Sequence, residues 1–214
     1  WLGARGAEIQ FDRGLRTVDC QAGRAVRLRF ADGDEALGPD DQVVLALPPS
    51  RLRSVLQDAL PEIDPPEDSS AIVNVFFRLA DAPSEEQPKI IGVLSSTAQW
   101  IFQRVDVVSV TVSAADEIPI EDQALETTIP RIWDETRRAL GFPAGTPYLV
   151  ARLNKERRAT FDQSPAGVAK RMHPRCALAN LFLAGDATDT GLPATIEGAI
   201  RSGERAAAMI LQGN

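Results

Sequence analysis

The sequence predicts an α/β fold with an inserted α+β part, and three observations support this. VVLAL at 43–47 and LFLAG at 181–185 are apolar on both faces, as expected of covered strands in a layered α/β core. A loop and then a helix of about 17 residues from Thr195 follow LFLAG. Between the two runs, residues 71–114 hold four strand-like segments, and a helical pattern comes after them. That order favours a mixed-sheet-plus-helix domain inserted into the α/β core.

The first 60 residues are expected to form short strands and one helix. Apolar residues and arginines alternate along GRAVRLRF at 23–30, which is the period of a half-buried strand. Asp32-Gly33 then indicates a hairpin turn. Pro48-Pro49 ends the VVLAL strand, and Ser50 is the expected N-cap of the helix. The apolar residues of that helix follow helical spacing: Leu52, Val55, Leu56, Ala59 and Leu60.

The middle of the chain begins with a loop rich in Pro, Asp and Glu at 61–70, which predicts a domain crossing. AIVNVFFRL, IIGVL, QWIFQRV and VVSVTVSA are expected as strands within 71–114. A helix follows over roughly 121–140, and Pro130 is expected to kink or split it. A further strand, YLVARLN, is expected at 148–154.

This order predicts two domains made from three segments. Residues 1–57 and 155–214, the latter with a loop at 162–180, are expected to form one domain around an inserted domain at 58–154. Two independent domains in tandem are the simplest alternative. That alternative is disfavoured because a lone VVLAL or LFLAG strand is not a domain.

Composition and charge exclude several classes of protein. With 44% apolar and 25% charged residues, the 214-residue chain can bury a sizeable core. The net charge of −7 argues against a general nucleic-acid-binding surface. No run approaches the roughly 18 apolar residues of a membrane span. Cys20 and Cys176 form no CxxC pair, which favours a reducing, cytoplasmic compartment and gives neither a disulfide framework nor a metal site.

The stretch that carries chemistry is LFLAGDATDTGLPATIEGAIRSGERAA at 181–207. Small residues along its helix allow a flat ligand to approach the backbone closely. Free N–H groups at the helix start near Thr195, together with the helix dipole, suit a partially negative oxygen. Asp186, just past the strand, can accept hydrogen bonds from sugar-like hydroxyls. The alternative interpretation is an ordinary strand–loop–helix unit with an N-cap.

This stretch resembles the C-terminal flavin motif of the amine oxidase / phytoene desaturase superfamily of FAD enzymes. The resemblance implies that Gly185 and Asp186 lie near the ribityl and diphosphate groups of FAD. It also implies cofactor binding by Ala194, Thr195 and Ile196, with the N–H groups near Thr195 and Ile196 facing the flavin pyrimidine. Those groups would stabilise negative charge on a reduced flavin.

Two further segments, GLRTV at 14–18 and DDQVVLALPP at 40–49, match the same superfamily. The match implies that the backbone of Val18 meets the adenine, although Val18 would equally be a core strand residue. The implied fold is a partial FAD-binding domain of the two-domain flavin amine oxidase type with an inserted substrate domain.

The sequence contains no GxGxxG, the turn of the Rossmann unit that holds the FAD diphosphate. In this superfamily that unit lies at the N-terminus. Residue 1 is Trp, and WLGARGAEIQF has neither the basic start nor the apolar core of a signal peptide. The sequence is therefore interpreted as a C-terminal fragment whose Rossmann unit lies upstream.

Within the superfamily, NKERRATFDQSP at 154–165 and SSAIVNVFFRLAD at 69–81 resemble the squalene-associated branch of phytoene desaturase-like enzymes. GDATDTGLPATIEGAIRSG and QWIF resemble it as well. Members of that branch take hydroxysqualene to squalene in bacterial hopanoid biosynthesis. The resemblance covers nearly the whole chain and implies an FAD-dependent oxidoreductase that acts on a hydrophobic isoprenoid. A carotenoid-type desaturase and a non-catalytic lipid- or partner-binding module stay open as alternatives.

An amine substrate is disfavoured by two departures from the amine oxidases. Asn74 stands where those enzymes usually carry a lysine near the flavin, so Asn74 is a candidate substrate contact instead. Thr195 stands where they place a tyrosine of the amine-binding cage, and the chain has one tyrosine, Tyr148. A largely apolar polyene needs no such cage.

Several aromatic and basic side chains each have two candidate roles. Four aromatic residues are candidates to line an apolar tunnel, with core packing as the alternative for at least half of them: Phe76, Phe77, Trp100 and Phe102. Arg157 or Arg158 is a candidate for the substrate hydroxyl or the flavin, and a solvated edge strand is the equal alternative. His173 is interpreted as an exposed loop residue. No catalytic acid or base is assigned.

The implied substrate sets the expected partners. Transfer of a C30 isoprenoid through water is prohibitive at about 0.8 kcal/mol per CH₂. Peripheral contact with the inner membrane through the inserted domain at 58–154 is therefore expected, although the protein is otherwise cytoplasmic. The apolar VVLAL and LFLAG strands favour a homodimer when they lack sheet neighbours.

Overall fold

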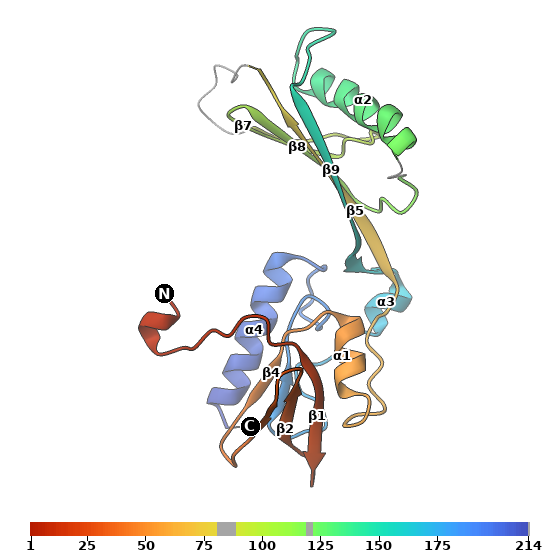
Figure 1. Ribbon diagram of the computed structural model, residues 1–214. Helices are drawn as coiled ribbons and strands as arrows, with labels where there is room; N and C mark the ends of the chain where they lie inside the picture. Colours follow the sequence, from red (N-terminus) through yellow and green to blue (C-terminus); the bar gives the residue numbers. More distant parts are fainter. Residues whose placement is uncertain (81–88, 119–121, 214) are drawn as a thin grey trace. The chain divides into compact units, whose positions relative to one another are not determined.

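The computed structural model describes residues 1–80, 89–118 and 122–213 of the chain (Figure 1). They divide into two compact units. Unit 1 comprises Trp1–Asp68 and Phe161–Asn214, and unit 2 comprises Ser69–Thr160. The mixed α/β content agrees with the predicted fold class.

Unit 1 begins with a short 3₁₀ helix, Gly3–Arg5, and a three-stranded antiparallel sheet in the order β1-β2-β3. Its strands are β1 (Leu15–Gln21), β2 (Arg24–Phe30) and β3 (Asp34–Ala36). Ala22 and Gly23 both have positive φ, as a two-residue hairpin turn requires. The expected Asp32-Gly33 turn joins β2 to β3, a strand that the apolar pattern did not predict because all three of its residues are exposed.

The two apolar runs far apart in the sequence pair directly. β4 (Val43–Leu45) and β10 (Leu181–Leu183) are parallel neighbours, with Val43 opposite Leu181 and Leu45 opposite Leu183. The side chain of Asn180, which is fully buried, accepts the Ala25 N–H and donates to the carbonyls of Ala25 and Asp41. This side chain therefore ties β2 to the β4–β10 pair.

Helix α1 (Pro49–Leu56) packs Leu52, Val55 and Leu56 into the same core. It begins one residue before Ser50, the expected N-cap. Pro48 is the N-cap residue and makes no side-chain cap bond, since the ring of Pro49 fixes φ for the first helical turn and has no N–H to satisfy. Two further helices follow in unit 1, α3 (Pro165–Ala169) within the expected loop and α4 (Ile196–Leu211).

Unit 2 is a five-stranded sheet with one helix on it, in the strand order β6-β7-β8-β5-β9 (Figure 1). The strands are β5 (Ser69–Arg78), β6 (Lys89–Gly92), β7 (Trp100–Arg104), β8 (Val107–Val112) and β9 (Val150–Phe161). Alternate residues of β5, β7 and β8 are buried in a core with Ile132 and Trp133 of helix α2 (Asp122–Ala139). The indole of Trp133 lies 4.9 Å from the Phe77 ring and 5.6 Å from the Tyr148 ring, between centroids.

Helix α2 runs continuously through Pro130, so the expected split at this residue is wrong. A proline removes one helical hydrogen bond. Here Pro130 is exposed, whereas Ile132 and Trp133 just after it are buried against the sheet. Packing of that face holds the helix together across the missing bond.

The unit boundaries differ from those expected at 57/58 and 154/155. The acidic loop after α1 stays with unit 1 because Arg53 pairs with both Asp64 and Glu67. Strand β9 runs past the expected end at 154 and reaches Phe161. No helix of the described residues is long and apolar enough to cross a membrane.

Candidate functional site

The end of β10 is tied to helix α4 in unit 1. Gly185 has φ of +120°, a conformation that favours glycine, and its N–H donates to Ser202 Oγ at 2.7 Å. Ser202 is fully buried and in turn donates to the Ala199 carbonyl. The chain therefore turns sharply as it leaves the strand, and the turn is fixed to the second turn of the helix.

The loop after Gly185 is held mainly by the guanidinium group of Arg171. Arg171 donates to the carbonyls of Asp186 and Thr188 at 3.0 and 2.6 Å and to that of Leu192 at 2.5 Å. A fourth, longer bond reaches Thr190 Oγ1. All of these acceptors are neutral, and no described carboxylate forms an ion pair with Arg171. The loop between β10 and α4 is thus held by a cation that has no ion-pair partner among the described residues.

The start of α4 presents free N–H groups. Thr195 is the N-cap, and its Oγ1 accepts the Gly198 N–H at 3.1 Å. Ala194 N–H is held by Gln163 Oε1 at 2.9 Å. The N–H groups of Ile196 and Glu197 have no acceptor among the described residues, as expected at a helix start. These donors, with the dipole of a 16-residue helix behind them, suit an electron-rich oxygen or nitrogen.

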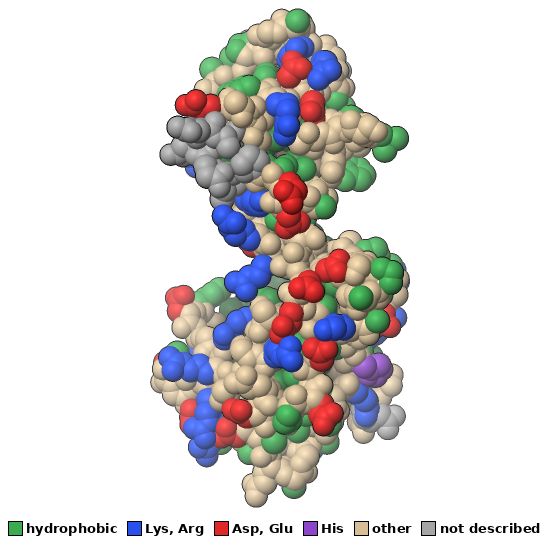
Figure 2. All heavy atoms as spheres, turned by 90° about the vertical axis from the view of Figure 1, so that its right-hand side faces the viewer, with side chains coloured by type: hydrophobic (Ala, Val, Ile, Leu, Met, Phe, Trp, Pro, Cys, Tyr) green, Lys and Arg blue, Asp and Glu red, His purple; other side chains and the backbone are tan. Residues whose placement is uncertain are grey.

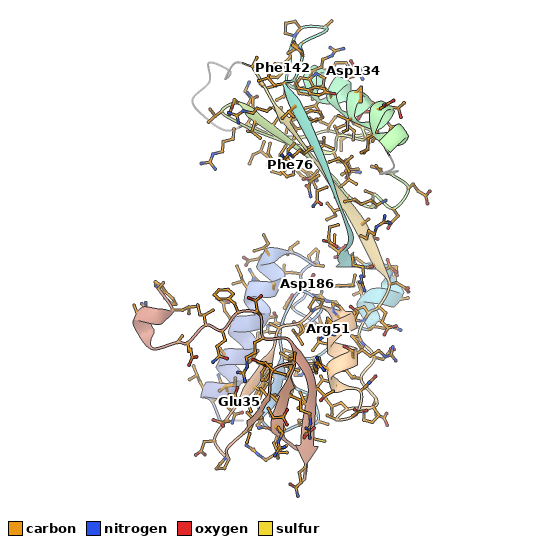
Figure 3. The ribbon with its side chains drawn as sticks, viewed as in Figure 1. Glu35, Arg51, Phe76, Asp134, Phe142 and Asp186 are labelled. Carbon is orange, nitrogen blue, oxygen red and sulfur yellow. The ribbon has the colours of Figure 1, made fainter. Side chains whose placement is uncertain are left out.

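Asp186 belongs to the loop between β10 and α4 (Figure 3). It is half-buried, and its carboxylate has no hydrogen-bond or ion-pair partner in the described part of the chain. An acceptor of this kind suits a polyhydroxylated chain such as a ribityl group. The acceptor at Asp186 and the donors at the start of α4 are therefore a set that fits a flavin, and the positive charge of Arg171 does not conflict with it.

Val18 lies on β1, with its backbone paired to Leu28. Its side chain is 2% exposed and belongs to the unit 1 core. The core role expected for this residue is therefore present. The contact of its backbone with adenine stays a prediction.

Unit 2 brings together four of the predicted substrate-lining residues. Helix α2 covers one face of the sheet, and the other face, here called the open face, carries side chains in rows across β6, β7, β8 and β5. The strand register gives two adjacent rows: Ile90–Phe102–Ser109–Phe76, and Gly92–Trp100–Thr111–Asn74. Asn74, Phe76, Trp100 and Phe102 thus share one face although they come from two strands.

Exposure separates lining residues from core residues. Phe76, Trp100 and Phe102 are 44%, 51% and 38% exposed, and Phe77, on the opposite face, is fully buried. Phe77 is therefore a core residue and not part of a tunnel. A hollow of about 420 Å³ on the open face is lined by Phe76, Phe102, Ser109 and the turn between β7 and β8.

Arg158 is not part of these rows. β9 is antiparallel to β5, since the Leu149 N–H bonds the Arg78 carbonyl at one end and the Asp162 N–H bonds the Asp68 carbonyl at the other. Arg158 therefore lies toward the Asp68 end, with an exposed side chain, and so does Arg157. A solvated strand position describes both arginines in this structure.

The described residues contain no cluster of metal-ligating side chains that would indicate a metal site. On the face that Figure 2 shows, basic and acidic side chains are interspersed in both units. No group of three or more His, Cys, Asp or Glu could hold a metal ion in the described part of the chain. His173 is exposed. Burial raises the pKa of the Cys176 thiol, which favours the unreactive protonated form.

Sequence reasoning missed Arg171, Ser202, Gln163 and Thr111. Each contributes through a bond to a residue distant in sequence, and no local motif marks such a bond. A weak signal was present for Ser202, which is one of the small residues on the α4 face.

Comparison with known proteins now decides the family. The sequence model of the family described as "Flavin containing amine oxidoreductase" matches residues 2–211. The chain belongs to this flavin-containing amine oxidoreductase family. The cofactor expected from the sequence, FAD, agrees with the flavin of the family.

Three curated relatives of this family member are named hydroxysqualene dehydroxylase. The protein from Rhodopseudomonas palustris is 41% identical over 211 residues, and the proteins from Zymomonas mobilis and Sinorhizobium fredii are 38% and 39% identical. Each alignment covers 98–99% of this chain and 48–49% of the relative. The chain thus spans about half the length of the curated relatives it matches.

Two solved structures share the fold of this family member. A putative protoporphyrinogen oxidase from Exiguobacterium is similar with a TM-score of 0.61 at 15% identity, over 96% of this chain and 48% of that one. An oxidoreductase from Methanosarcina mazei is similar with a TM-score of 0.68 at 13% identity, over 97% of this chain and 51% of that one.

Proposed function

We propose that the complete protein is an FAD-dependent oxidoreductase that reductively removes the hydroxyl group of hydroxysqualene to give squalene. The observation that carries this proposal is the 38–41% identity, over nearly the whole chain, to three relatives of that name. The open face of unit 2 supports it, since its two rows contain three exposed aromatic side chains and no carboxylate that would pair with an amine.

The cofactor is proposed to contact unit 1 through Gly185, Asp186 and the residues Ala194, Thr195 and Ile196. Reduced FAD would supply a hydride to the carbon that loses its hydroxyl group. The carboxylate of Asp186 would accept hydrogen bonds from the ribityl hydroxyls. The N–H groups at the start of α4 would face the flavin pyrimidine and stabilise its negative charge. The overall reaction would convert hydroxysqualene and reduced flavin into squalene, water and oxidised flavin.

The substrate is proposed to bind on the open face, against Phe76, Trp100 and Phe102, and to enter from a bilayer surface. Exposed apolar side chains extend beyond the three aromatic residues: Ile90 is 68%, Leu94 93% and Val105 65% exposed. A polyene is held by apolar area, and burial contributes about 25 cal/mol per Å². We therefore expect turnover of the complete protein to be faster with liposomes than in plain buffer, and equal rates would contradict bilayer entry.

Products distinguish this function from its alternatives. The FAD-loaded complete protein, reduced with dithionite, is incubated with hydroxysqualene, and in parallel the oxidised protein is incubated with phytoene. We expect squalene from the first reaction and unchanged phytoene from the second. Desaturated phytoene would indicate a carotenoid-type desaturase, and a purified protein that binds no flavin would contradict an oxidoreductase role altogether.

A further inference from the structure

One polar pair lies within the aromatic rows of the open face. Asn74 on β5 and Thr111 on β8 are direct cross-strand partners, and Thr111 Oγ1 donates to Asn74 Oδ1 at 2.7 Å. On the other side of Thr111, its partner across the row is Trp100. Phe76 is the next residue of β5 on the same face.

This hydrogen bond fixes the orientation of the Asn74 amide. Because the amide oxygen is occupied by the Thr111 hydroxyl, the two N–H donors on Nδ2 face the other way. They have no acceptor among the described residues, and the side chain is half-buried. Water can satisfy such donors while the face is open. A ligand that covers the face must bring an acceptor or leave them unpaired, which is costly in a dehydrated site.

We propose that the Asn74 amide, held by Thr111, donates a hydrogen bond to the hydroxyl oxygen of the isoprenoid substrate. This inference rests on the proposed function and adds a residue that distinguishes substrate from product. The substrate brings one oxygen acceptor on an otherwise apolar chain, which matches one oriented donor group beside Trp100 and Phe76. The hydrocarbon product has no acceptor and leaves the amide unpaired, so it binds more weakly and is released. Sites built to hydrogen-bond a hydroxyl discriminate strongly against analogues that lack it.

Three other polar groups on β5, β7 and β8 are less suited to that role. Arg78 is engaged by Asp106 at 2.9 Å. Arg104 is exposed at the end of β7, where water solvates its charge. Ser109 lies in the next row without the fixed orientation that a hydrogen-bonded neighbour gives to Asn74.

The test compares two ligands that differ in one hydroxyl group. Hydroxysqualene and squalene are titrated into the oxidised, FAD-loaded complete protein in mixed micelles, and binding is followed through the flavin absorption spectrum. The variants are Asn74→Leu, which keeps a similar volume, and Thr111→Val, which frees the amide to rotate. The matched control is Thr146→Val, which removes a 2.8 Å hydroxyl bond to the Pro143 carbonyl in the loop after α2.

We expect wild-type protein to prefer hydroxysqualene over squalene, and Asn74→Leu to lower that preference about tenfold, mainly by weakening hydroxysqualene. Thr111→Val should lower it by a smaller factor of about three, and Thr146→Val should leave both affinities unchanged. A preference that survives both Asn74→Leu and Thr111→Val would overturn this inference and leave the proposed function intact. Wild-type protein that binds neither ligand would overturn the proposed function and this inference with it. The Thr111→Val variant keeps the test decisive if Asn74→Leu does not fold.

Discussion

Ser202 on α4 accepts the N–H of Gly185, just past the end of β10, at an N–O distance of 2.7 Å. Ser202 is fully buried, and its hydroxyl is the acceptor of that N–H among the described residues. The bond joins the strand to the helix at the point where the implied flavin contacts Gly185 and Asp186 begin. The positions of Gly185 and Asp186 in the candidate flavin site therefore depend on the Ser202 side chain in the second turn of α4.

Replacement of Ser202 by Ala should remove the acceptor of the Gly185 N–H, which belongs to a half-buried residue. We expect the free energy of unfolding to fall by about 0.5–1.5 kcal/mol and FAD affinity to fall with it. Urea unfolding and flavin titration of the complete protein measure the two effects. Ser50→Ala is the control, because the Ser50 side chain is exposed and makes no described hydrogen bond. Equal stability of the two variants would contradict this role of Ser202.

Arg171 should be required for the shape of the loop before α4. Arg171→Met removes the donors to the carbonyls of Asp186, Thr188 and Leu192, so we expect FAD affinity to fall by at least about tenfold. Arg171→Lys keeps the charge but loses the planar fork, so it should restore only part of the affinity. As the control we suggest Arg205→Met, which removes donors to Asp189 and Thr190 from an exposed side chain. Wild-type affinity in Arg171→Met would refute the prediction.

Glu135 on α2 should stabilise unit 2 in a pH-dependent manner. Its burial alone would raise its pKa, but hydrogen bonds from Ser96 and from the residues after it outweigh that effect and hold the pKa below the ordinary value of 4.5. A lowered pKa means that the folded protein prefers the ionised carboxylate. Its contribution is therefore present above about pH 4.5 and is lost as the pH falls through the lower, folded-state pKa.

Glu135→Gln tests this contribution. At pH 7 we expect a loss of about 1–3 kcal/mol in the free energy of unfolding, because the ionised acceptor is replaced by a neutral amide. The difference between wild type and variant should shrink when urea unfolding is repeated at successively lower pH below 4.5. A difference that stays constant over that range would show that the charge of the Glu135 carboxylate is not what stabilises its contact with Ser96 and Ala98.

The 214-residue chain by itself should bind FAD weakly. No GxGxxG turn occurs in its sequence, and Asp186 adds a negative charge where the cofactor already carries a diphosphate. Fluorescence titration with FAD should give no stoichiometric binding at micromolar concentrations. Among the described residues β4 has no strand partner other than β10, which leaves one edge of β4 unpaired, so light scattering should also detect dimers. A tight complex with FAD would require a second phosphate site in this chain.

Much of the fold follows from short-range patterns in the sequence. VVLAL and LFLAG were expected as covered strands of one core because they are apolar on both faces, and they do pair as β4 and β10. The expected cover is complete only for β10, since Val44 of β4 is 43% exposed. Helix α2 was expected from its periodic apolar residues, but its continuity through Pro130 was not, because tertiary packing of Ile132 and Trp133 decides it.

The candidate site could be predicted only in part. The motif at 181–207 marked Asp186 and Thr195 because strand, turn and N-cap chemistry is local in sequence. Arg171 and Thr111 were missed, since each acts through a partner that only the folded chain brings near: Asp186 for Arg171, and Asn74 for Thr111. The shared face of Phe76 and Phe102 likewise depends on strand register, which hydrophobic alternation alone does not give.

A single-turnover reaction tests the central claim most directly. The FAD of the complete protein is reduced under anaerobic conditions, one equivalent of hydroxysqualene is added, and flavin reoxidation and squalene are measured together. The account predicts that one squalene forms for each flavin reoxidised. Flavin that stays reduced while hydroxysqualene remains unchanged would contradict it.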